Sequence, residues 1–183
     1  MNFNAMKYYK NLLGFEVDSE YPLIYWKLFD LKRRLEEIEP QVIFEMGTGY
    51  TTKIFDDYAK KTGATVYSID ENREYQEEFF KKLDIKLVNS IISPVTKDDI
   101  VETVEYKLLI EECDLLYVDG PDTSFSEIPY ACLFDPNAEH VLYDIRMPSV
   151  IYEAENCGNY IYDFGYGFHQ NFFGRYHTYG RKK

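Results

Sequence analysis

The sequence has few cysteines and few basic residues relative to acidic ones, and each shortage excludes a class of protein. Its three cysteines are Cys113, Cys132 and Cys157, and their odd number and wide spacing fit neither a disulfide framework nor a zinc site. Lysine and arginine number 20 against 32 acidic residues, which gives a formal net charge of −12. A surface of this sign repels phosphate backbones, so nucleic acid is not expected as a partner.

Long apolar runs are missing as well. No apolar stretch approaches the roughly 20 residues that a membrane-spanning helix needs. The opening "MNFNAMKYYKNLLGFEVD" lacks the apolar core and cleavage site of a secretory signal. We therefore expect a cytoplasmic protein without membrane contact. The 183 residues are 45% hydrophobic, which suits one domain over residues 1–183 with a single core.

What the sequence does contain is an alternation of strand and helix patterns. Apolar residues recur every three or four positions in residues 21–38 and predict a helix that Pro40 ends, with N-terminal helices over roughly 1–39. Strand patterns follow, separated by helical ones, at 41–47, 64–70, 85–91, 113–120 and 139–146. An aromatic-rich tail, roughly 159–181, predicts two closing strands. This order predicts an α/β fold with a doubly wound, mostly parallel seven-stranded sheet, helices on both faces in three layers, and the last strand antiparallel.

Two closely spaced glycines follow the first predicted strand, in "EMGTGYTT" at residues 45–52. Such a turn brings a ligand close to the backbone, and dinucleotides, phosphates and S-adenosylmethionine all use one. Asp70 ends the second predicted strand 21 residues after Gly49. This matches the spacing of about 20 residues between a glycine turn and an acid that binds ribose hydroxyls. We therefore expect a ligand with a nucleoside, and a helix N-cap is the alternative role of Asp70.

Charge separates the two nucleoside cofactors that fit this pattern. Thr52 stands where the dinucleotide fingerprint has its third glycine, and Glu45 stands two residues before the first glycine, Gly47. A carboxylate beside a pyrophosphate is repelled by roughly 4 kcal/mol at about 4 Å and an effective dielectric constant near 20. S-adenosylmethionine carries a sulfonium and an ammonium instead. Carboxylates at Glu45, Asp70 and Asp119 therefore favour this cofactor over NAD.

Polar residues also end the other predicted strands. In open α/β sheets, ligands bind beyond the carboxyl ends of the strands, so these ends mark the candidate site. In chain order the candidates are Glu45, Gly47, Thr48 and Gly49 after the first strand, Asp70 and Glu71 after the second, Asn89 and Ser90 at the third, Asp119 at the fourth and Asp144 at the fifth. An acid at a strand end is also a common helix cap, so the set indicates a site more strongly than any member.

Three segments in this order, "FEMGTGYTT", "VYSIDEN" and "DLLYVDGP", resemble the class I S-adenosylmethionine-dependent methyltransferases over roughly residues 40–147. The resemblance implies these cofactor contacts: the methionine part at Glu45, Gly47 and Gly49, ribose at Asp70, adenine near Asn89 or Ser90, and the amino group and transferred methyl near Asp119. The "GTGYTT" and "VDGP" variants are most similar to small methyltransferases that act on hydroxyl groups of small molecules or sugars. A small-molecule acceptor is therefore expected.

One departure from the resemblance concerns metal. Some oxygen methyltransferases hold Mg²⁺ between an acid after the fourth strand and an Asp-Asn pair after the fifth. Here Asp119 and Asp144 match, but Ile145 replaces the asparagine. One oxygen ligand of a hard cation is then missing, so a divalent metal is not favoured.

A hydroxyl acceptor needs a base nearby, and Asp144 is the first candidate. Its alternative role is to cap the following turn or to pair with Arg146. His169, between the two closing strands, and Asp122 are further candidates for the base. His177 is expected to be structural, as is His140, which starts the fifth predicted strand.

Three other interpretations stay open. An NAD-dependent oxidoreductase would share this architecture, although Thr52 and Glu45 oppose it. A catalytically silent binding protein would keep the fold, but its expected mark, a broken glycine turn, is absent from the sequence. An aromatic tail that forms the edge of a homodimer is compatible with catalysis.

The role of Tyr50, next to the second glycine, also has two interpretations: it either covers the cofactor or packs in the core.

Overall fold

The computed structural model describes residues 3–18, 22–92, 112–118, 140–145, 160–163 and 176–182. Their helices are α1 (Phe3–Leu13), α2 (Pro22–Ile38), α3 (Tyr50–Thr62) and α4 (Arg73–Leu83). Their strands are β1 (Val42–Met46), β2 (Thr65–Asp70), β3 (Val88–Ile92), β4 (Leu115–Val118), β5 (His140–Ile145), β6 (Tyr160–Asp163) and β7 (Tyr176–Lys182). Within these ranges no helix is both long and apolar enough to cross a bilayer.

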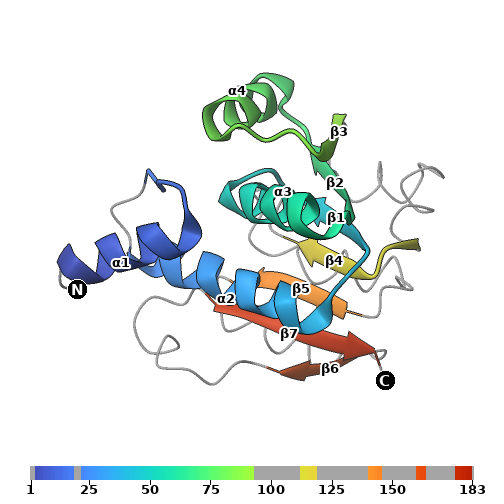
Figure 1. Ribbon diagram of the computed structural model, residues 1–183. Coiled ribbons are helices and arrows are strands. Elements are labelled where there is room, and N and C mark those ends of the chain that lie inside the picture. The colour runs from blue at the N-terminus through green and yellow to red at the C-terminus, as the bar shows by residue number, and fades with distance from the viewer. Residues whose placement is uncertain are drawn as a thin grey trace.

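The strands form one sheet in the order β3-β2-β1-β4-β5-β7-β6 (Figure 1). β1 pairs in parallel with β2 on one side and with β4 on the other, and β3 and β5 extend the parallel part outward. β7 runs antiparallel to both β5 and β6. The chain builds the sheet in opposite directions from β1, so the switch point, where ligands bind in such sheets, lies between β1 and β4.

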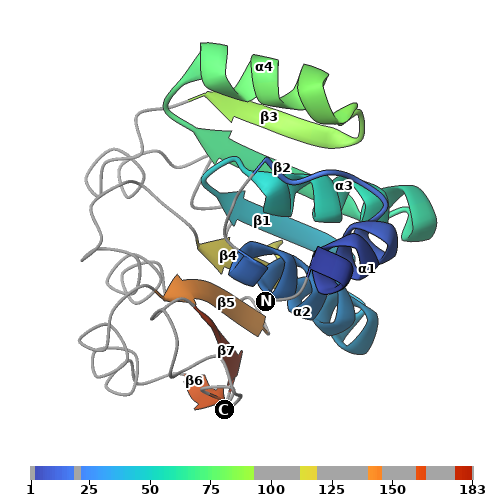
Figure 2. The ribbon, with the colours of Figure 1, turned by 90° about the vertical axis from the view of Figure 1, so that its left-hand side faces the viewer.

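The four helices lie in one layer against one face of the sheet (Figure 2). The apolar stripe of α2 contributes Leu31, which is fully buried and packs in one cluster with Ile43 of β1 and Tyr117 of β4. Phe44 and Met46 alternate with Ile43 along β1 and therefore point to the opposite face, yet they are fully buried too. Both faces of the central strands are thus covered, and the predicted α/β class with its mostly parallel sheet is confirmed.

Most predicted elements match the observed ones in type and position. Gly63 caps the C-terminus of α3, where it has φ 82° and donates its N–H to the carbonyl of Ala59 at 2.8 Å. The third strand is shifted: the pattern predicts it at 85–91 with Asn89 and Ser90 at its end, whereas β3 runs from Val88 to Ile92 and these two residues lie inside it. The helical patterns between the third and fourth strands and after the fifth strand lie outside the described residues.

A buried carboxylate on α3 fixes the start of β3. Asp56 is fully buried, and its Oδ1 accepts the backbone N–H groups of Lys86 at 2.9 Å and Leu87 at 2.8 Å. Its Oδ2 accepts from Lys60 Nζ at 2.5 Å. Burial by itself would raise the pKa of Asp56, but the hydrogen bonds from Lys60 and from the two amides outweigh it and lower that pKa overall. The ionised side chain therefore ties α3 to the edge of the sheet.

Candidate functional site

The turn between β1 and α3 is formed by Gly47, Thr48 and Gly49. Gly47 has φ 94°, a conformation that costs a residue with a side chain about 1–2 kcal/mol. Gly49 is the extended N-cap residue of α3. A Cβ built on Gly49 would meet, within 4 Å in the described part of the chain, only Thr51 Oγ1 at 3.9 Å. The fold itself does not require glycine at position 49, whereas a ligand seated against the backbone would.

Glu45 lies behind this turn. Its side chain is 0% exposed. Oε1 accepts the hydroxyl of Thr51 at 2.6 Å, and Oε2 accepts the hydroxyl of Thr52 at 2.7 Å. These charge-assisted hydrogen bonds compensate the burial of the carboxylate and fasten the first turn of α3 to the end of β1. Direct contact of Glu45 with a cofactor stays a prediction that this burial does not favour.

Thr52 shows why a hydroxyl replaces the third glycine of the dinucleotide fingerprint. Its side chain is fully buried. Oγ1 donates to Glu45 and at the same time accepts the N–H of Gly49 at 2.9 Å. A hydroxyl can do both, and glycine can do neither. Thr52 therefore holds both the supporting carboxylate and the backbone of the turn.

The three amides of the turn are all bound within the protein. The N–H of Gly47 donates to the carbonyl of Ile69 at 2.9 Å, and that of Gly49 donates to Thr52 Oγ1. The N–H of Thr48 donates to Asp70 Oδ2 at 3.0 Å. Turns that bind phosphate point such N–H groups at the anion. In this turn these donors are already used, so the turn is poorly suited to a pyrophosphate.

Asp70 at the end of β2 joins the turn to α4. Besides the N–H of Thr48, it accepts the N–H of Asn72 at Oδ1, at 2.9 Å. Asn72 caps α4, because its own side chain accepts the N–H of Tyr75 at 3.0 Å. The alternative interpretation of Asp70 as the helix N-cap is therefore wrong. Two backbone bonds use about half of the roughly four acceptor sites of a carboxylate, so Asp70 can also accept hydrogen bonds from a diol.

Glu71 is placed next to Asp70, on an exposed edge. It lines a shallow, open hollow together with Asn72, Arg73 and Glu74. The hollow adjoins the carboxyl end of β2, the edge at which the nucleoside is predicted to bind. A direct role of Glu71 in cofactor binding stays a prediction.

A buried network that the sequence analysis missed lies behind Thr48. Gln76 of α4 is 1% exposed, and its Nε2 donates to Thr48 Oγ1 at 2.8 Å and to the carbonyl of Ser68 at 3.2 Å. The Ser90 hydroxyl donates to Gln76 Oε1, and the hydroxyls of Thr48 and Ser68 lie 3.1 Å apart. One sequence signal could have found it: Gln76 shares the apolar face of α4 with Phe79, three residues later, so a polar residue occupies a core position.

Asn89 and Ser90 lie farther from the carboxyl edge than predicted. They are level with Tyr67 and Ser68 of β2, whereas Ile92 is level with Asp70. At about 3.3 Å per residue, Ser90 is two residues, or roughly 7 Å, short of that edge. Ser90 bonds to Gln76, and Asn89 Nδ2 donates to the carbonyl of Val66 at 2.9 Å. Their contact with adenine stays a prediction that these positions do not favour.

Tyr50 packs in the helix layer. Its ring meets Phe79 edge-on at 5.1 Å between centroids and stacks on Phe15 at 6.5 Å. Its hydroxyl accepts the backbone N–H of Asp18 at 2.8 Å. Of the two predicted roles, packing is the one that these contacts support, because the ring joins α3 to α4 and to the N-terminal region.

The candidate catalytic residues are described only in part. Asp119, which follows the last residue of β4, lies outside the described residues, as do His169 and Asp122. Asp144 lies in β5, one residue beyond the pairing of Tyr143 with Val118, at the same edge of the sheet as the glycine turn. Across the β5–β7 ladder it is in register with His177, and such opposed residues have Cα atoms about 4.5–5.5 Å apart. In the described part of the chain no cluster of three metal-ligating side chains occurs.

No protein-family model and no curated protein matches the sequence. Solved structures do match. A Podospora anserina methyltransferase with bound S-adenosylhomocysteine aligns with a TM-score of 0.56 at 17% identity, over 98% of this chain and 88% of that chain. A Staphylococcus aureus protein assigned as a caffeoyl-CoA O-methyltransferase gives 0.60 at 13% identity, over 100% and 93%. The N-methyltransferase NodS from Bradyrhizobium japonicum gives 0.55 at 11% identity, over 89% and 97%. The fold is therefore that of the class I S-adenosylmethionine-dependent methyltransferases, as the sequence motifs predict.

Proposed function

We propose that this protein is an S-adenosylmethionine-dependent methyltransferase that acts on a hydroxyl group of a small molecule or sugar. The observation that carries the proposal is the position of Asp70. Its carboxylate ends β2, is fixed by the N–H groups of Thr48 and Asn72, and stands beside the glycine turn at the carboxyl edge of the sheet. A fixed carboxylate with acceptor sites left is suited to the two hydroxyls of a ribose.

The glycine turn supports this cofactor over a dinucleotide. The amides at residues 47, 48 and 49 are bound within the protein, and the buried Glu45 lies directly behind them. A pyrophosphate would therefore find few donors and a nearby negative charge, whereas a cationic ligand is attracted by that charge. Gly49 leaves room for close approach of the ligand to the backbone.

When bound, S-adenosylmethionine supplies an electrophilic methyl group on its sulfonium. The protein's own contribution to an in-line displacement is chiefly to hold the acceptor in line with that group. In our proposal the turn at residues 47–49 holds the methionine part, Asp70 holds the ribose, and Asp119 lies near the amino group. Asp144 is the first candidate for the base that takes the acceptor proton, and His169 and Asp122 remain further candidates. His177, expected from the sequence to be structural, joins them in our proposal because it is in register with Asp144.

Titration calorimetry with S-adenosylmethionine, S-adenosylhomocysteine and NAD tests the cofactor. We expect micromolar binding of the first two and none of NAD. Asp70→Ala should weaken binding at least about ten-fold, because two hydrogen bonds to a charged acceptor are lost. Glu78→Gln, which removes an exposed charge from α4, serves as the matched control and should bind like the wild type.

Two results would contradict the proposal. Tight binding of NAD, with no response to the sulfonium compound or its product, would indicate an oxidoreductase. Binding of none of the three would favour a catalytically silent binding protein.

If the cofactor binds, the acceptor is sought by transfer of labelled methyl from S-adenosylmethionine to a panel of phenols, catechols and sugars, with and without Mg²⁺. A pH profile of the transfer that flattens in Asp144→Asn would identify the base.

A further inference from the structure

Four residues at the predicted ribose site form a closed ring of hydrogen bonds. Asp70 Oδ2 accepts the N–H of Thr48 at 3.0 Å, and Thr48 Oγ1 accepts from Gln76 Nε2 at 2.8 Å. The backbone N–H of Gln76 donates to the carbonyl of Asn72 at 3.0 Å, and the N–H of Asn72 returns to Asp70 Oδ1 at 2.9 Å. The ring links the glycine turn, the end of β2 and the first turn of α4.

Gln76 is the buried member that closes this ring from the helix side. Both N–H bonds of its amide are used, one by Thr48 Oγ1 and one by the carbonyl of Ser68, and its Oε1 accepts from Ser90. A backbone carbonyl accepts hydrogen bonds only, so the contact with Ser68 fixes which end of the amide is nitrogen. Because Gln76 is 1% exposed, water cannot readily replace these bonds, and they hold the amide in one orientation.

We propose that Gln76 is a positioning residue that aligns the Asp70 carboxylate for the ribose hydroxyls of the cofactor. Gln76 does so without touching the ligand. It fixes the hydroxyl of Thr48, and the backbone N–H of Thr48 in turn orients the Asp70 carboxylate. Without the Gln76 contact, the Thr48 hydroxyl keeps its 3.1 Å contact with the Ser68 hydroxyl but loses the bond to α4. Thr48 is then held less firmly, and the Asp70 carboxylate is directed less precisely, although the N–H of Asn72 still binds it. This inference rests on the proposed function for its ligand, but the ring is a property of the protein alone.

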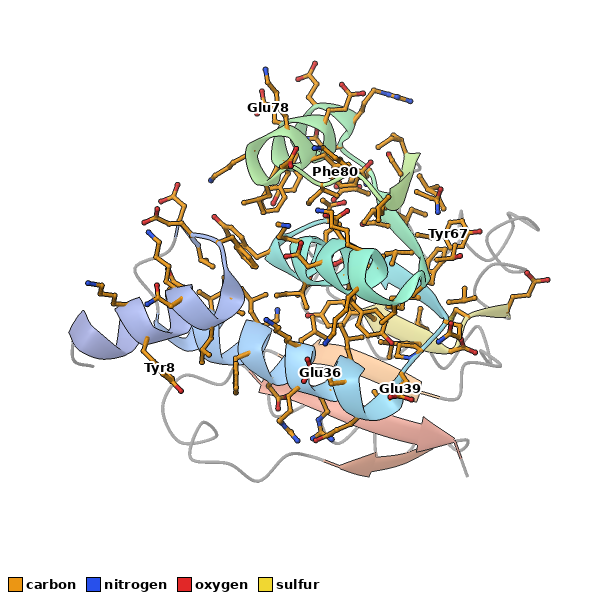
Figure 3. All side chains as sticks on the ribbon, in the orientation of Figure 1. Tyr8, Glu36, Glu39, Tyr67, Glu78 and Phe80 are labelled. Carbon is orange, nitrogen blue, oxygen red and sulfur yellow. The ribbon has the colours of Figure 1, made fainter. Side chains whose placement is uncertain are left out.

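The first test uses the protein without ligand. Amide hydrogen exchange is measured at Thr48 and Asn72 in the wild type, in Gln76→Met, which keeps the side-chain length but has no donors, and in Glu78→Gln. Glu78 lies on the outer side of the same helix (Figure 3) and is exposed. The N–H of Thr48 is protected by its bond to Asp70, and the turn should open more easily once the Thr48 hydroxyl has lost its bond to Gln76. We expect exchange at Thr48 to rise at least about ten-fold in Gln76→Met and to stay unchanged in Glu78→Gln, because one such bond is worth roughly this factor.

The second test separates a positioning role from a general loosening of the site. Binding of S-adenosylhomocysteine is compared with binding of its analogue that lacks both ribose hydroxyls. If Gln76 acts through Asp70, Gln76→Met weakens S-adenosylhomocysteine about ten-fold and the analogue less than about two-fold. Asp70→Asn should then show little further loss in the double variant, since both changes affect the same contact.

An equal loss for both ligands, additive effects of the two variants, or unchanged exchange at Thr48 would each overturn the inference. Thr48→Val removes the same contact from the other side with little change of shape, together with the contact between the hydroxyls of Thr48 and Ser68. It replaces Gln76→Met if that variant does not fold. The failure of the proposed function looks different. In that case wild-type protein does not bind S-adenosylhomocysteine, and Gln76 has no cofactor to position, although exchange at Thr48 still responds to Gln76→Met.

Discussion

Replacing Thr52 by valine tests how the glycine turn is held. Valine matches threonine in shape, so the change leaves no cavity, but it removes the hydroxyl that donates to Glu45 Oε2 at 2.7 Å and accepts the N–H of Gly49 at 2.9 Å. A hydrogen bond to a charged group contributes about 1.5–3 kcal/mol and a neutral one about 0.5–1.5 kcal/mol. Both are lost at a side chain with 0% exposure, where water cannot compensate. We expect the free energy of unfolding to fall by about 2–4 kcal/mol.

The assay is urea unfolding followed by far-ultraviolet circular dichroism. With a slope of about 2 kcal/mol per molar urea, the midpoint should shift down by about 1–2 M. Thr52→Ser keeps the hydroxyl and loses one methyl group, so it should cost only about 1 kcal/mol. Thr65→Val changes an exposed threonine at the start of β2 and should cost less than about 1 kcal/mol. If valine at position 52 costs no more than serine, the hydroxyl does not hold the turn, and the structural role assigned to Thr52 is refuted.

Three further predictions concern the turn, a buried acid and a buried thiol. Gly47→Ala should cost about 1–2 kcal/mol of stability because of the positive φ. Gly49→Ala should cost less than about 1 kcal/mol of stability but should weaken the binding of S-adenosylhomocysteine. If Gly49→Ala binds this ligand as tightly as the wild type, no ligand lies against the backbone at position 49. Asp56→Ala leaves the N–H groups of Lys86 and Leu87 without their acceptor and should lower the free energy of unfolding by about 2–4 kcal/mol. Because the pKa of Asp56 is lowered on folding, the ionised side chain contributes fully above its unfolded pKa, and this contribution disappears as pH falls through its folded pKa. The free energies of unfolding of wild type and variant should therefore converge as the pH is lowered. Burial, and then the charge of Asp114, raise the pKa of Cys113 to about 12, so the thiol should react with a disulfide reagent only on unfolding. Ionisation of this thiol in the unfolded chain should lower wild-type stability by up to about 1.4 kcal/mol per pH unit from about pH 9 toward 12, and the stability of Cys113→Val should fall less steeply by this amount.

Much of the fold follows from local patterns. The apolar period of α2, the short buried runs of β1 and β4, and the positive-φ glycine that ends α3 are each set by neighbours within a few residues, so the chain itself identifies them. The spacing between the glycine turn and Asp70 likewise predicts that they lie together, and in the structure the backbone N of Thr48 is 3.0 Å from Asp70 Oδ2.

The errors occur where distant segments meet. The third strand continues past Asn89 and Ser90 because its pairing with β2 runs to Asp70, and pairing length depends on the partner strand rather than on local composition. The hydrogen bonds of Glu45 to α3 also come from such a meeting, because side chains alternate along β1 and the register with its neighbours sends this one to the helix face. Its predicted contact with a cofactor stays a prediction.

Residue type and spacing along the chain are enough to predict the α/β order of elements, the glycine turn and the sign of charge around it. They do not reveal which donors of the turn are already used, or that Gln76, Thr48, Asp70 and Asn72 close into one ring. Hydrogen bonding and burial are settled between segments that meet only after folding, such as Thr48 and Gln76, 28 positions apart. The role of a buried polar residue on a helix can be identified only when the groups that form its hydrogen bonds are known.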